Sequence, residues 1–179
     1  MINIIESQLK DVKIIEPQIF DDNRGYFFES YNQKEFVKKI GEFNFIQDNE
    51  SKSSFGVLRG MHYQKKPYEQ SKLIRVVKGE IQDVVIDLRK ESPYYLKHAS
   101  FILNDKNKKQ IFIPKGFAHG FLVLSKDAIV NYKVDNFYNA NYEFSIPFNH
   151  PNLKINWKID HKKIIISDKD KVKSANVII

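Results

Sequence analysis

The stretch SKLIRVVKGEIQDVVIDL, residues 71–88, decides the fold. Its first half is a short apolar run, and in its second half Ile81, Asp83 and Val85 alternate with residues of the other face. A period of two is the mark of a strand, and Gly79 stands between the halves where a turn is needed. The stretch therefore predicts a β-hairpin whose second strand points Asp83 inward.

Further short β-like runs lie at residues 97–103, 110–113, 118–124 and 129–134, with polar turns between them. Many short strands joined by close turns are typical of a sandwich or a barrel, so the sequence predicts a mainly β protein. Neither a repeat nor a flexible linker divides the chain. We therefore expect residues 1–179 to form one domain.

One helix is predicted before this β-rich region, at residues 33–40. Asn32 is a candidate N-cap, Glu35 follows three residues later, and an apolar stripe completes the pattern. The segment from about residue 152 is too polar and irregular for its elements to be predicted. Within it, Trp157 is expected to anchor the chain to the body of the protein.

Composition excludes several classes of function. The chain has no cysteine, which removes thiol catalysis, iron–sulfur ligation and cysteine-rich zinc sites, and this fits a reducing cytoplasm. Its net charge of +7 comes largely from lysines spread in ones and twos, without a nucleic-acid-binding motif. No apolar run approaches the roughly 20 residues of a membrane span. We expect a cytoplasmic protein that binds neither nucleic acid nor membrane.

Two of the five histidines stand in unusual surroundings. His62 lies in VLRGMHYQ, residues 57–64, and His119 lies in IPKGFAHGF, residues 113–121. A single histidine in such a place is more often a core side chain than a functional one, but two of them favour a functional site. The other three histidines lie among polar or turn residues and are expected at the surface.

Residues 114–119 have the Pro-x-Gly-x-x-His pattern of the cupin barrels, many of which bind a catalytic metal. Metal-binding cupins usually carry a His-x-His pair on an earlier strand, whereas His62 is followed by Tyr63 and Gln64. A transition-metal site needs several imidazole, thiolate or carboxylate ligands that converge. The sequence therefore predicts no metal site, and metal-dependent catalysis is the rival interpretation.

Six strings, in order and spanning nearly the whole chain, resemble the dTDP-4-dehydrorhamnose 3,5-epimerases. They are NRGYFFE (23–29), FIQDN (45–49), GVLRGMHYQ (56–64), KLIRVVKGE (72–80), PKGFAHGFLVL (114–124) and SDKD (167–170). The resemblance implies a cupin-like jelly-roll β-sandwich with a few short helices, which forms a homodimer and uses neither metal nor cofactor. It also implies a nucleotide-linked substrate, a dTDP-4-keto-6-deoxyhexose.

The resemblance further implies roles for single residues. His62 matches the family base, Asp170 matches the carboxylate that orients it, and Tyr132 matches the acid. The residues that match positions around the sugar and its 4-keto oxygen are Arg59, Lys72 and His119. The residues that match contacts to the nucleotide or its diphosphate are Arg24, Glu29, Gln47, Asn49, Glu143 and Lys169, with Tyr138 where an aromatic is expected near the base. Asp83 is expected to pair with His119.

These residue types suit proton transfer at carbons next to a ketone. Loss of such a proton spreads negative charge onto the carbonyl oxygen as an enolate, so the reaction needs a base on one face, an acid on the other and cations at the oxygen. An imidazole titrates at about 6.5 and a phenol at about 10, which suits His62 as the base and Tyr132 as the acid. Lys72 and Arg59 would stabilise the enolate oxygen.

Two departures from the family pattern leave the substrate open. Glu143 is followed by Phe144 and Ser145 where an arginine and a glycine are common, and residues 149–151 read NHP where NDP is usual. These changes fall in a segment expected near the nucleotide. An alternative substrate is therefore a GDP-linked 4-keto-6-deoxyheptose of capsule synthesis, inverted at one carbon or at two. From another class, the alternatives are a non-catalytic sugar-nucleotide-binding protein and a metal-dependent cupin.

Overall fold

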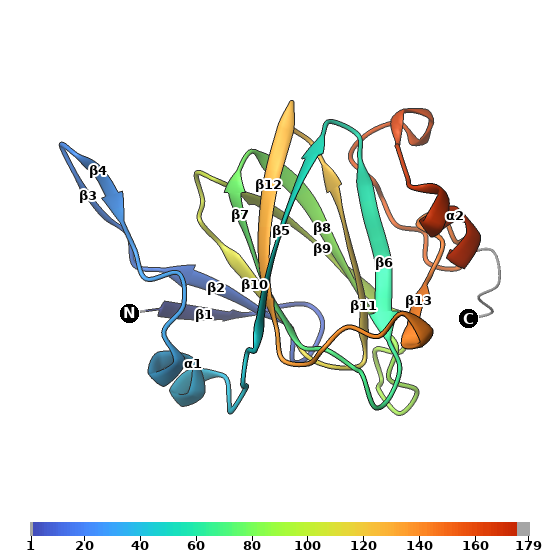
Figure 1. Ribbon diagram of the computed structural model, residues 1–179, viewed down its shortest axis with the longest axis horizontal. Helices are drawn as coiled ribbons and strands as arrows, with labels where there is room; N and C mark the ends of the chain where they lie inside the picture. Colours follow the sequence, from blue (N-terminus) through green and yellow to red (C-terminus); the bar gives the residue numbers. More distant parts are fainter. Residues whose placement is uncertain (1, 175–179) are drawn as a thin grey trace.

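Two antiparallel β-sheets pack face to face in the computed structural model, which describes residues 2–174 (Figure 1). The larger sheet has the order β1 (Ile2–Glu6), β2 (Lys13–Pro17), β10 (Gln110–Ile113), β7 (Lys72–Lys78), β12 (Asp127–Val134) and β5 (Gln47–Ser54). The smaller sheet has the order β13 (Glu143–Ser145), β6 (Leu58–Gln64), β11 (Phe117–Val123), β8 (Glu80–Asp87) and β9 (His98–Asn104). A separate hairpin of β3 (Phe20–Asp22) and β4 (Gly25–Phe27) projects as an arm.

The order of the strands makes the sandwich a jelly roll. From β5 to β13 the chain changes sheet at every connection except the one between β8 and β9. The helices are short: α1 (Gln33–Lys39), α2 (Asp168–Ser174) and single 3₁₀ turns at Ala140–Tyr142 and His161–Lys163. The predicted mainly β sandwich with a few short helices is thereby confirmed, and the four runs predicted after residue 90 appear as β9 to β12.

The predicted hairpin at residues 71–88 is wrong. Both strands exist, but β7 pairs with β10 and β12 in the larger sheet, whereas β8 pairs with β11 and β9 in the smaller one. Gly79 carries the chain from one sheet to the other with a φ of +81°, and a Cβ there would lie 2.1 Å from the carbonyl oxygen of Asp127. Alternation located the strands but not their partners, because it is the same whichever strand lies alongside.

Apolar side chains fill the space between the sheets and also cover the outer face of each. The inner core includes Val85 and Phe121. On the outer face of the smaller sheet, Trp157 is only 5% exposed and donates a hydrogen bond from Nε1 to the carbonyl of Phe148 at 2.9 Å, which confirms the predicted anchor. Because both faces of this sheet are covered, every residue of β8 after Glu80 is buried.

The predicted helix is present as α1, which covers the outer face of the larger sheet. Asn32 accepts a hydrogen bond from the backbone N–H of Glu35 at 3.3 Å, as an N-cap does. Phe36 is 2% exposed and packs edge-on against Phe112 of β10, with ring centroids 5.4 Å apart. Within the described residues, no helix is long and apolar enough to cross a membrane.

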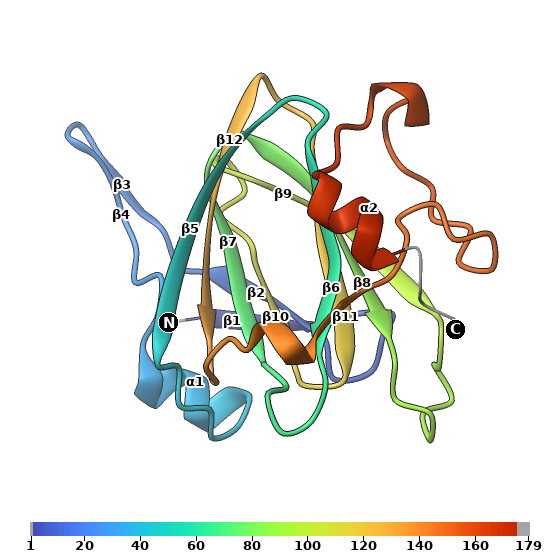
Figure 2. The ribbon, with the colours of Figure 1, turned by 45° about the vertical axis from the view of Figure 1, so that its right-hand side comes forward.

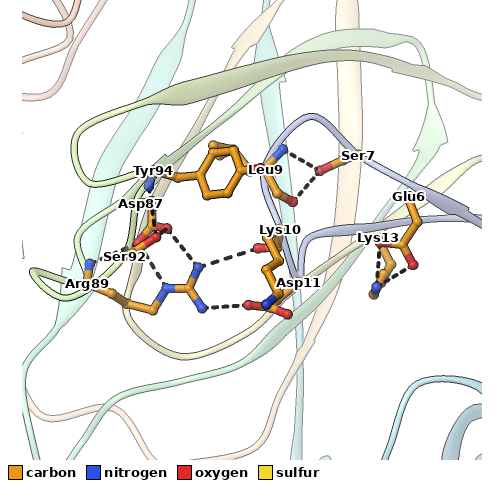
Figure 3. A network of polar contacts seen from close by, with 10 residues as sticks. All are labelled: Glu6, Ser7, Leu9, Lys10, Asp11, Lys13, Asp87, Arg89, Ser92 and Tyr94. Atoms are coloured by element: carbon orange, nitrogen blue, oxygen red, sulfur yellow. Dashed lines mark hydrogen bonds and ion pairs between the residues drawn. The ribbon is translucent and has the colours of Figure 1, made fainter.

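A polar network ties the turn between β1 and β2 to the loop after β8 (Figure 3). Arg89 donates to the buried Asp87 at 3.0 and 2.7 Å and to Asp11 at 2.7 Å. Its guanidinium also lies 4.5 Å from the centre of the Phe117 ring, and a Cβ at Gly116 would lie 2.7 Å from its Cγ. The network therefore packs directly behind Gly116 and Phe117, two residues that line the cavity described next.

Candidate active site

Two adjoining cavities, of 330 Å³ and 470 Å³, open between the sheets. They share four residues, His62, Lys72, Tyr132 and Glu143. His62 and Glu143 belong to the smaller sheet, whereas Lys72 and Tyr132 belong to the larger one. A molecule in these cavities would therefore meet chemically different walls on its two sides.

His62 is paired with a carboxylate from the far end of the chain. Its Nε2 lies 2.6 Å from Oδ1 of Asp170, which stands in the first turn of α2 beside the edge of the smaller sheet (Figure 2). Ser167 precedes the helix and accepts the backbone N–H of Asp170 on its Oγ at 3.1 Å, as an N-cap does. Burial would raise the pKa of Asp170, but the hydrogen bond and charge of His62 hold it below its ordinary value. Asp170 is therefore an anion that can stabilise a protonated imidazole.

A bulge in β6 sets the position of His62. His119 on β11 lies opposite His62 and Phe121 lies opposite Arg59, so β6 carries one extra residue between them. Gly60, in this interval, has a φ of +127°, and a Cβ there would lie 2.4 Å from Cα of Gly120. The two backbones can approach this closely only because both positions are glycine.

A second histidine–carboxylate pair lies deeper in the smaller sheet. Nε2 of His119 is 2.8 Å from Oδ2 of Asp83, which is the predicted contact, and Asp83 is fully buried. Burial lowers the pKa of His119; the nearby charges of Lys72 and His62 lower it further, and Asp83 opposes them. His119 is therefore a neutral hydrogen-bonding group near pH 7. Oδ1 of Asp83 has no hydrogen-bond partner among the described residues.

Lys72 and Tyr132 form the opposite wall on neighbouring strands of the larger sheet. Burial lowers the pKa of Lys72 to about 8, although the charges of Asp83 and Glu143 oppose the shift. Burial raises the pKa of Tyr132, and the charge of Arg59 opposes this. At neutral pH the wall therefore carries a protonated phenol and an ammonium that is readily deprotonated.

The remaining predicted residues of the cavities are held by specific contacts. Arg59 donates from Nε to Oγ of Ser53 at 2.9 Å. Gln47 and Asn49 point inward from β5 and are joined by a 2.8 Å hydrogen bond.

A network centred on Glu143 joins α2 to the rim of the cavity. Tyr138 donates its hydroxyl hydrogen to Oε2 of Glu143 at 2.9 Å, and Nζ of Lys169 lies 2.9 Å from the same oxygen. The hydrogen bond to Glu143 is also the main reason that the pKa of Lys169 is raised. Lys169 thus holds the helix that supplies Asp170.

Arg24 and Glu29 lie outside the cavities. Arg24 is at the tip of the arm, where it pairs with Asp22 at 2.6 Å and its side chain is 85% exposed. Glu29 follows the arm and accepts a hydrogen bond from Asn32 at 3.1 Å. In Figure 1 the arm points away from the sandwich on the side opposite α2. Within one chain, these two predicted nucleotide contacts are not brought to the site.

Sequence reasoning did not find three serines that serve the site. Ser51 and Ser53 continue the inward-facing positions of β5 beyond Gln47 and Asn49, a period-two pattern that was present in the sequence. Ser167 stands three residues before Asp170, which is the spacing of an N-cap. That spacing was the available signal for α2, which was not predicted.

Phe144, the departure from the family pattern, faces away from the cavities. Because β13 pairs with β6, Glu143 and Gln64 share the inner face, whereas Phe144 and Tyr63 share the outer one. Their rings stack with centroids 5.7 Å apart, and Nζ of Lys65 lies 3.9 Å from the centre of the Phe144 ring. Phe144 therefore packs on the outer side of β13 and is not among the residues that line the cavities.

Among the described residues, no group of three or more histidine, cysteine, aspartate or glutamate side chains is placed to hold a metal ion. The two imidazoles of the site are instead each paired with a separate aspartate. Each pair leaves one imidazole nitrogen, Nδ1, outside the bond to its carboxylate.

Comparison with known proteins gives a consistent result. Residues 6–176 match the family model described as dTDP-4-dehydrorhamnose 3,5-epimerase. The dTDP-4-dehydrorhamnose 3,5-epimerase of Shigella flexneri is 47% identical over 169 residues, which are 94% of this chain and 92% of that protein.

Two solved structures are similar over almost the whole chain. The dTDP-6-deoxy-D-glucose-3,5-epimerase of Legionella pneumophila, in complex with dTDP-4-keto-L-rhamnose, has a TM-score of 0.93 and 44% identity, covering 97% of this chain and 92% of that one. A 3′-monoepimerase from Streptomyces bikiniensis, in complex with dTDP-quinovose, has a TM-score of 0.88 and 29% identity, covering 93% and 84%.

Proposed function

The chain belongs to the dTDP-4-dehydrorhamnose 3,5-epimerase family, and on that premise we propose which of its residues carry the reaction and on which substrate. It is an isomerase of the cupin-like fold that epimerises a nucleotide-linked 4-keto-6-deoxy sugar. The substrate proposed is dTDP-4-keto-6-deoxy-D-glucose, inverted at C3 and C5. His62 is the base and Tyr132 is the acid.

The observation that carries this proposal is the placement of His62 and Tyr132 on opposite sheets around shared cavities. Inversion of a carbon requires that the proton leaves one face and returns to the other. A base and an acid on the same wall could only return the proton to the face it left. Walls from two different sheets supply the two faces.

The bond to Asp170 fixes how His62 works. An imidazole that donates from Nε2 to a carboxylate carries its lone pair on Nδ1, so Nδ1 is the atom that takes the carbon-bound proton. The charge of Asp170 then stabilises the imidazolium. Tyr132 gives its hydroxyl proton to the opposite face of the same carbon, and exchange with solvent restores both groups.

Negative charge moves to the 4-keto oxygen in the enolate, after one proton has left the carbon and before another is added. Lys72 and Arg59 are the donors proposed for that oxygen, and neutral His119, which donates from Nε2 to Asp83, lines the cavity beside them. In other enzymes one such donor is worth about 10²–10³ in rate. Burial removes solvent from the ammonium of Lys72 and lowers its pKa, so an enolate oxygen would be a favourable partner.

The smaller cavity is the proposed site for the nucleotide end of the substrate. It is lined by Gln47, Asn49, Tyr138 and Glu143, and Lys169 pairs with Glu143. A dTDP group is favoured over GDP because the two similar structures described above hold dTDP sugars and because Phe144 does not line either cavity. We place the reaction in the cytoplasm, which suits a chain without cysteine.

A homodimer would reconcile the arm with the predicted roles of Arg24 and Glu29. The arm exposes the aromatic residues Phe20, Tyr26 and Phe27, which are 52%, 55% and 65% accessible. Exposed apolar groups on a projecting element are typical of a contact surface. In the proposed dimer, the arm of one copy reaches the cavity of the other and brings Arg24 to the diphosphate.

The decisive test is solvent exchange. In deuterium oxide, the protein should place deuterium at C3 and C5 of dTDP-4-keto-6-deoxy-D-glucose, as followed by NMR. Label at one carbon would make it a monoepimerase. Exchange at neither carbon, with dTDP binding intact, would reject the proposed function. A thermal-shift series with dTDP and GDP tests the nucleotide, since the correct one should raise Tm further.

The dimer is tested by mixing two inactive variants, Arg24→Ala and His62→Asn. If the arm acts on the partner's site, a mixed dimer contains one complete site, because the subunit with intact His62 receives an intact arm. Activity should then reappear on co-expression. Two inactive variants that stay inactive in an isolated mixed dimer would show that the arm serves its own chain or none.

A further inference from the structure

The inner face of β5 is a row of polar residues along the cavities. Gln47, Asn49, Ser51 and Ser53 alternate with the outward-facing residues of the strand. Gln47 and Asn49 bond to each other, and Ser53 accepts from Arg59. Three of the four side chains in the row are therefore held by protein contacts.

Ser51 is the exception in this row. Its Oγ is buried and has no hydrogen-bond partner among the described residues. A buried hydroxyl without a partner is energetically costly, so such a group is usually completed by a ligand or by water. Rotation about χ1 between staggered positions is open to a serine, which allows the hydroxyl to turn toward a ligand.

The surroundings of Ser51 fit a sugar. It lines the larger cavity and pairs with Val130 in the neighbouring strand, one inward-facing position away from Tyr132 and its partner Asn49. Adjacent inward positions on a strand are about 7 Å apart. Ser51 is therefore next to the proposed acid and one step beyond Asn49, which faces the nucleotide end. Phe121 also lines this cavity, so its wall is apolar in part.

We propose that Ser51 binds the C2 hydroxyl of the sugar and holds the ring while C3 and C5 are inverted. The inference rests on the proposed function. A 4-keto-6-deoxyhexose has ring hydroxyls at C2 and C3, and the one at C3 changes direction when that carbon inverts. The C2 hydroxyl keeps its place and adjoins C1, which carries the diphosphate. A serine hydroxyl both donates and accepts, as a sugar hydroxyl does.

The test uses two replacements of nearly equal shape, Ser51→Thr and Ser51→Val. Both are β-branched residues that suit a strand, and only threonine keeps the hydroxyl. In the solvent-exchange assay, we expect kcat/KM of Ser51→Val to be about tenfold below that of Ser51→Thr, which is the scale of one hydrogen bond. The control is Ser54→Ala, an exposed residue of the same strand, which should match the wild type.

Two further measurements separate the possible failures. With the analogue that lacks the C2 hydroxyl, the ratio between Ser51→Thr and Ser51→Val should fall to about one. A ratio that persists, or equal rates for the two variants with the true substrate, would overturn the inference. Calorimetry with dTDP and dTDP-glucose covers the case in which the wild type shows no exchange. In that case, Ser51→Val should weaken the binding of dTDP-glucose but not that of dTDP. If Ser51→Val and the wild type bind dTDP-glucose with equal affinity, the proposed role of Ser51 is rejected.

Discussion

The two histidine–carboxylate pairs of the smaller sheet use the same chemical groups in different surroundings. In the first pair, the side chains of His62 and Asp170 are 28% and 9% exposed; in the second, those of His119 and Asp83 are 10% and 0% exposed. The histidines lie directly opposite each other on β6 and β11. Burial lowers the pKa of His119, which keeps its imidazole neutral.

This difference indicates how one sheet can provide both a base and an imidazole that stays neutral. A base must accept a full charge during the reaction, and a group at the edge of the cavity can do so with the help of an anion and nearby water. The buried imidazole of His119 stays neutral and, because it donates from Nε2 to Asp83, can accept a hydrogen bond from a sugar hydroxyl at Nδ1. The depth of each pair in the sheet, rather than its composition, therefore decides its role.

The largest expected effect comes from replacing each of the two histidines in turn. His62→Asn should lower the exchange rate at least about a thousandfold, because a general base is lost. His119→Asn should lower it about a hundredfold or less, as for the loss of a group that positions the sugar. Deuterium incorporation measures both, and circular dichroism checks the fold. Equal losses for the two variants would contradict the division of roles.

Replacing the carboxylates should have a smaller effect. Asp170→Asn removes the charge that stabilises the His62 imidazolium and should reduce kcat about 10- to 100-fold, which corresponds to the loss of one hydrogen bond to a charged group. KM should change little, because Asp170 does not contact the sugar in the proposed mechanism. Steady-state kinetics separate the two constants. A change confined to KM would mean that Asp170 acts in binding instead.

The cation between the pairs predicts a pH dependence that distinguishes them. Lys72 has a pKa of about 8, so its ammonium is lost and activity should fall as pH rises through that value. The charge of Asp83 raises this pKa, so Asp83→Asn should move the alkaline fall to lower pH. Asp170 does not contribute to it, and Asp170→Asn is the matched control. If the alkaline fall in activity occurs at the same pH in Asp83→Asn as in the wild type, Lys72 is not the group that causes it.

The smallest expected effect concerns stability at low pH. Because the pKa of His119 is below its ordinary value of 6.5, the unfolded chain binds this proton at a higher pH than the folded one. The contribution of neutral His119 to the free energy of unfolding is therefore complete above pH 6.5. It declines as the pH falls through the lower pKa that His119 has in the folded protein. Asp170 also has a lowered pKa and loses its contribution in a more acidic range, below about 4.

Thermal unfolding from pH 7 to pH 5 separates these contributions. His119→Gln should make Tm less dependent on pH over this interval, in which the carboxyl group of Asp170 stays ionised. A wild-type slope that persists in His119→Gln would assign the proton uptake to another histidine.

Much of the site was predictable because its groups are marked by local sequence. Alternation put Asp83 on an inward face, and the deep setting of His119 in an apolar strand predicted their contact, which spans 36 residues. The cap before α1 and the anchoring role of Trp157 were likewise local properties. The proposed catalytic roles of His62, Tyr132 and Asp170 came from family resemblance and stay predictions until the exchange assay is done.

The sequence by itself determined the strands from β7 to β12, the cap of α1 and the chemical groups of the site, because periodicity and side-chain type are properties of short segments. The tertiary structure alone decided that β7 and β8 lie in different sheets, that α2 brings Asp170 to His62 across 108 residues, and that the arm leaves Arg24 outside its own cavity. These three features depend on how remote segments pack. Alternation of apolar and polar residues does not specify which strand lies alongside.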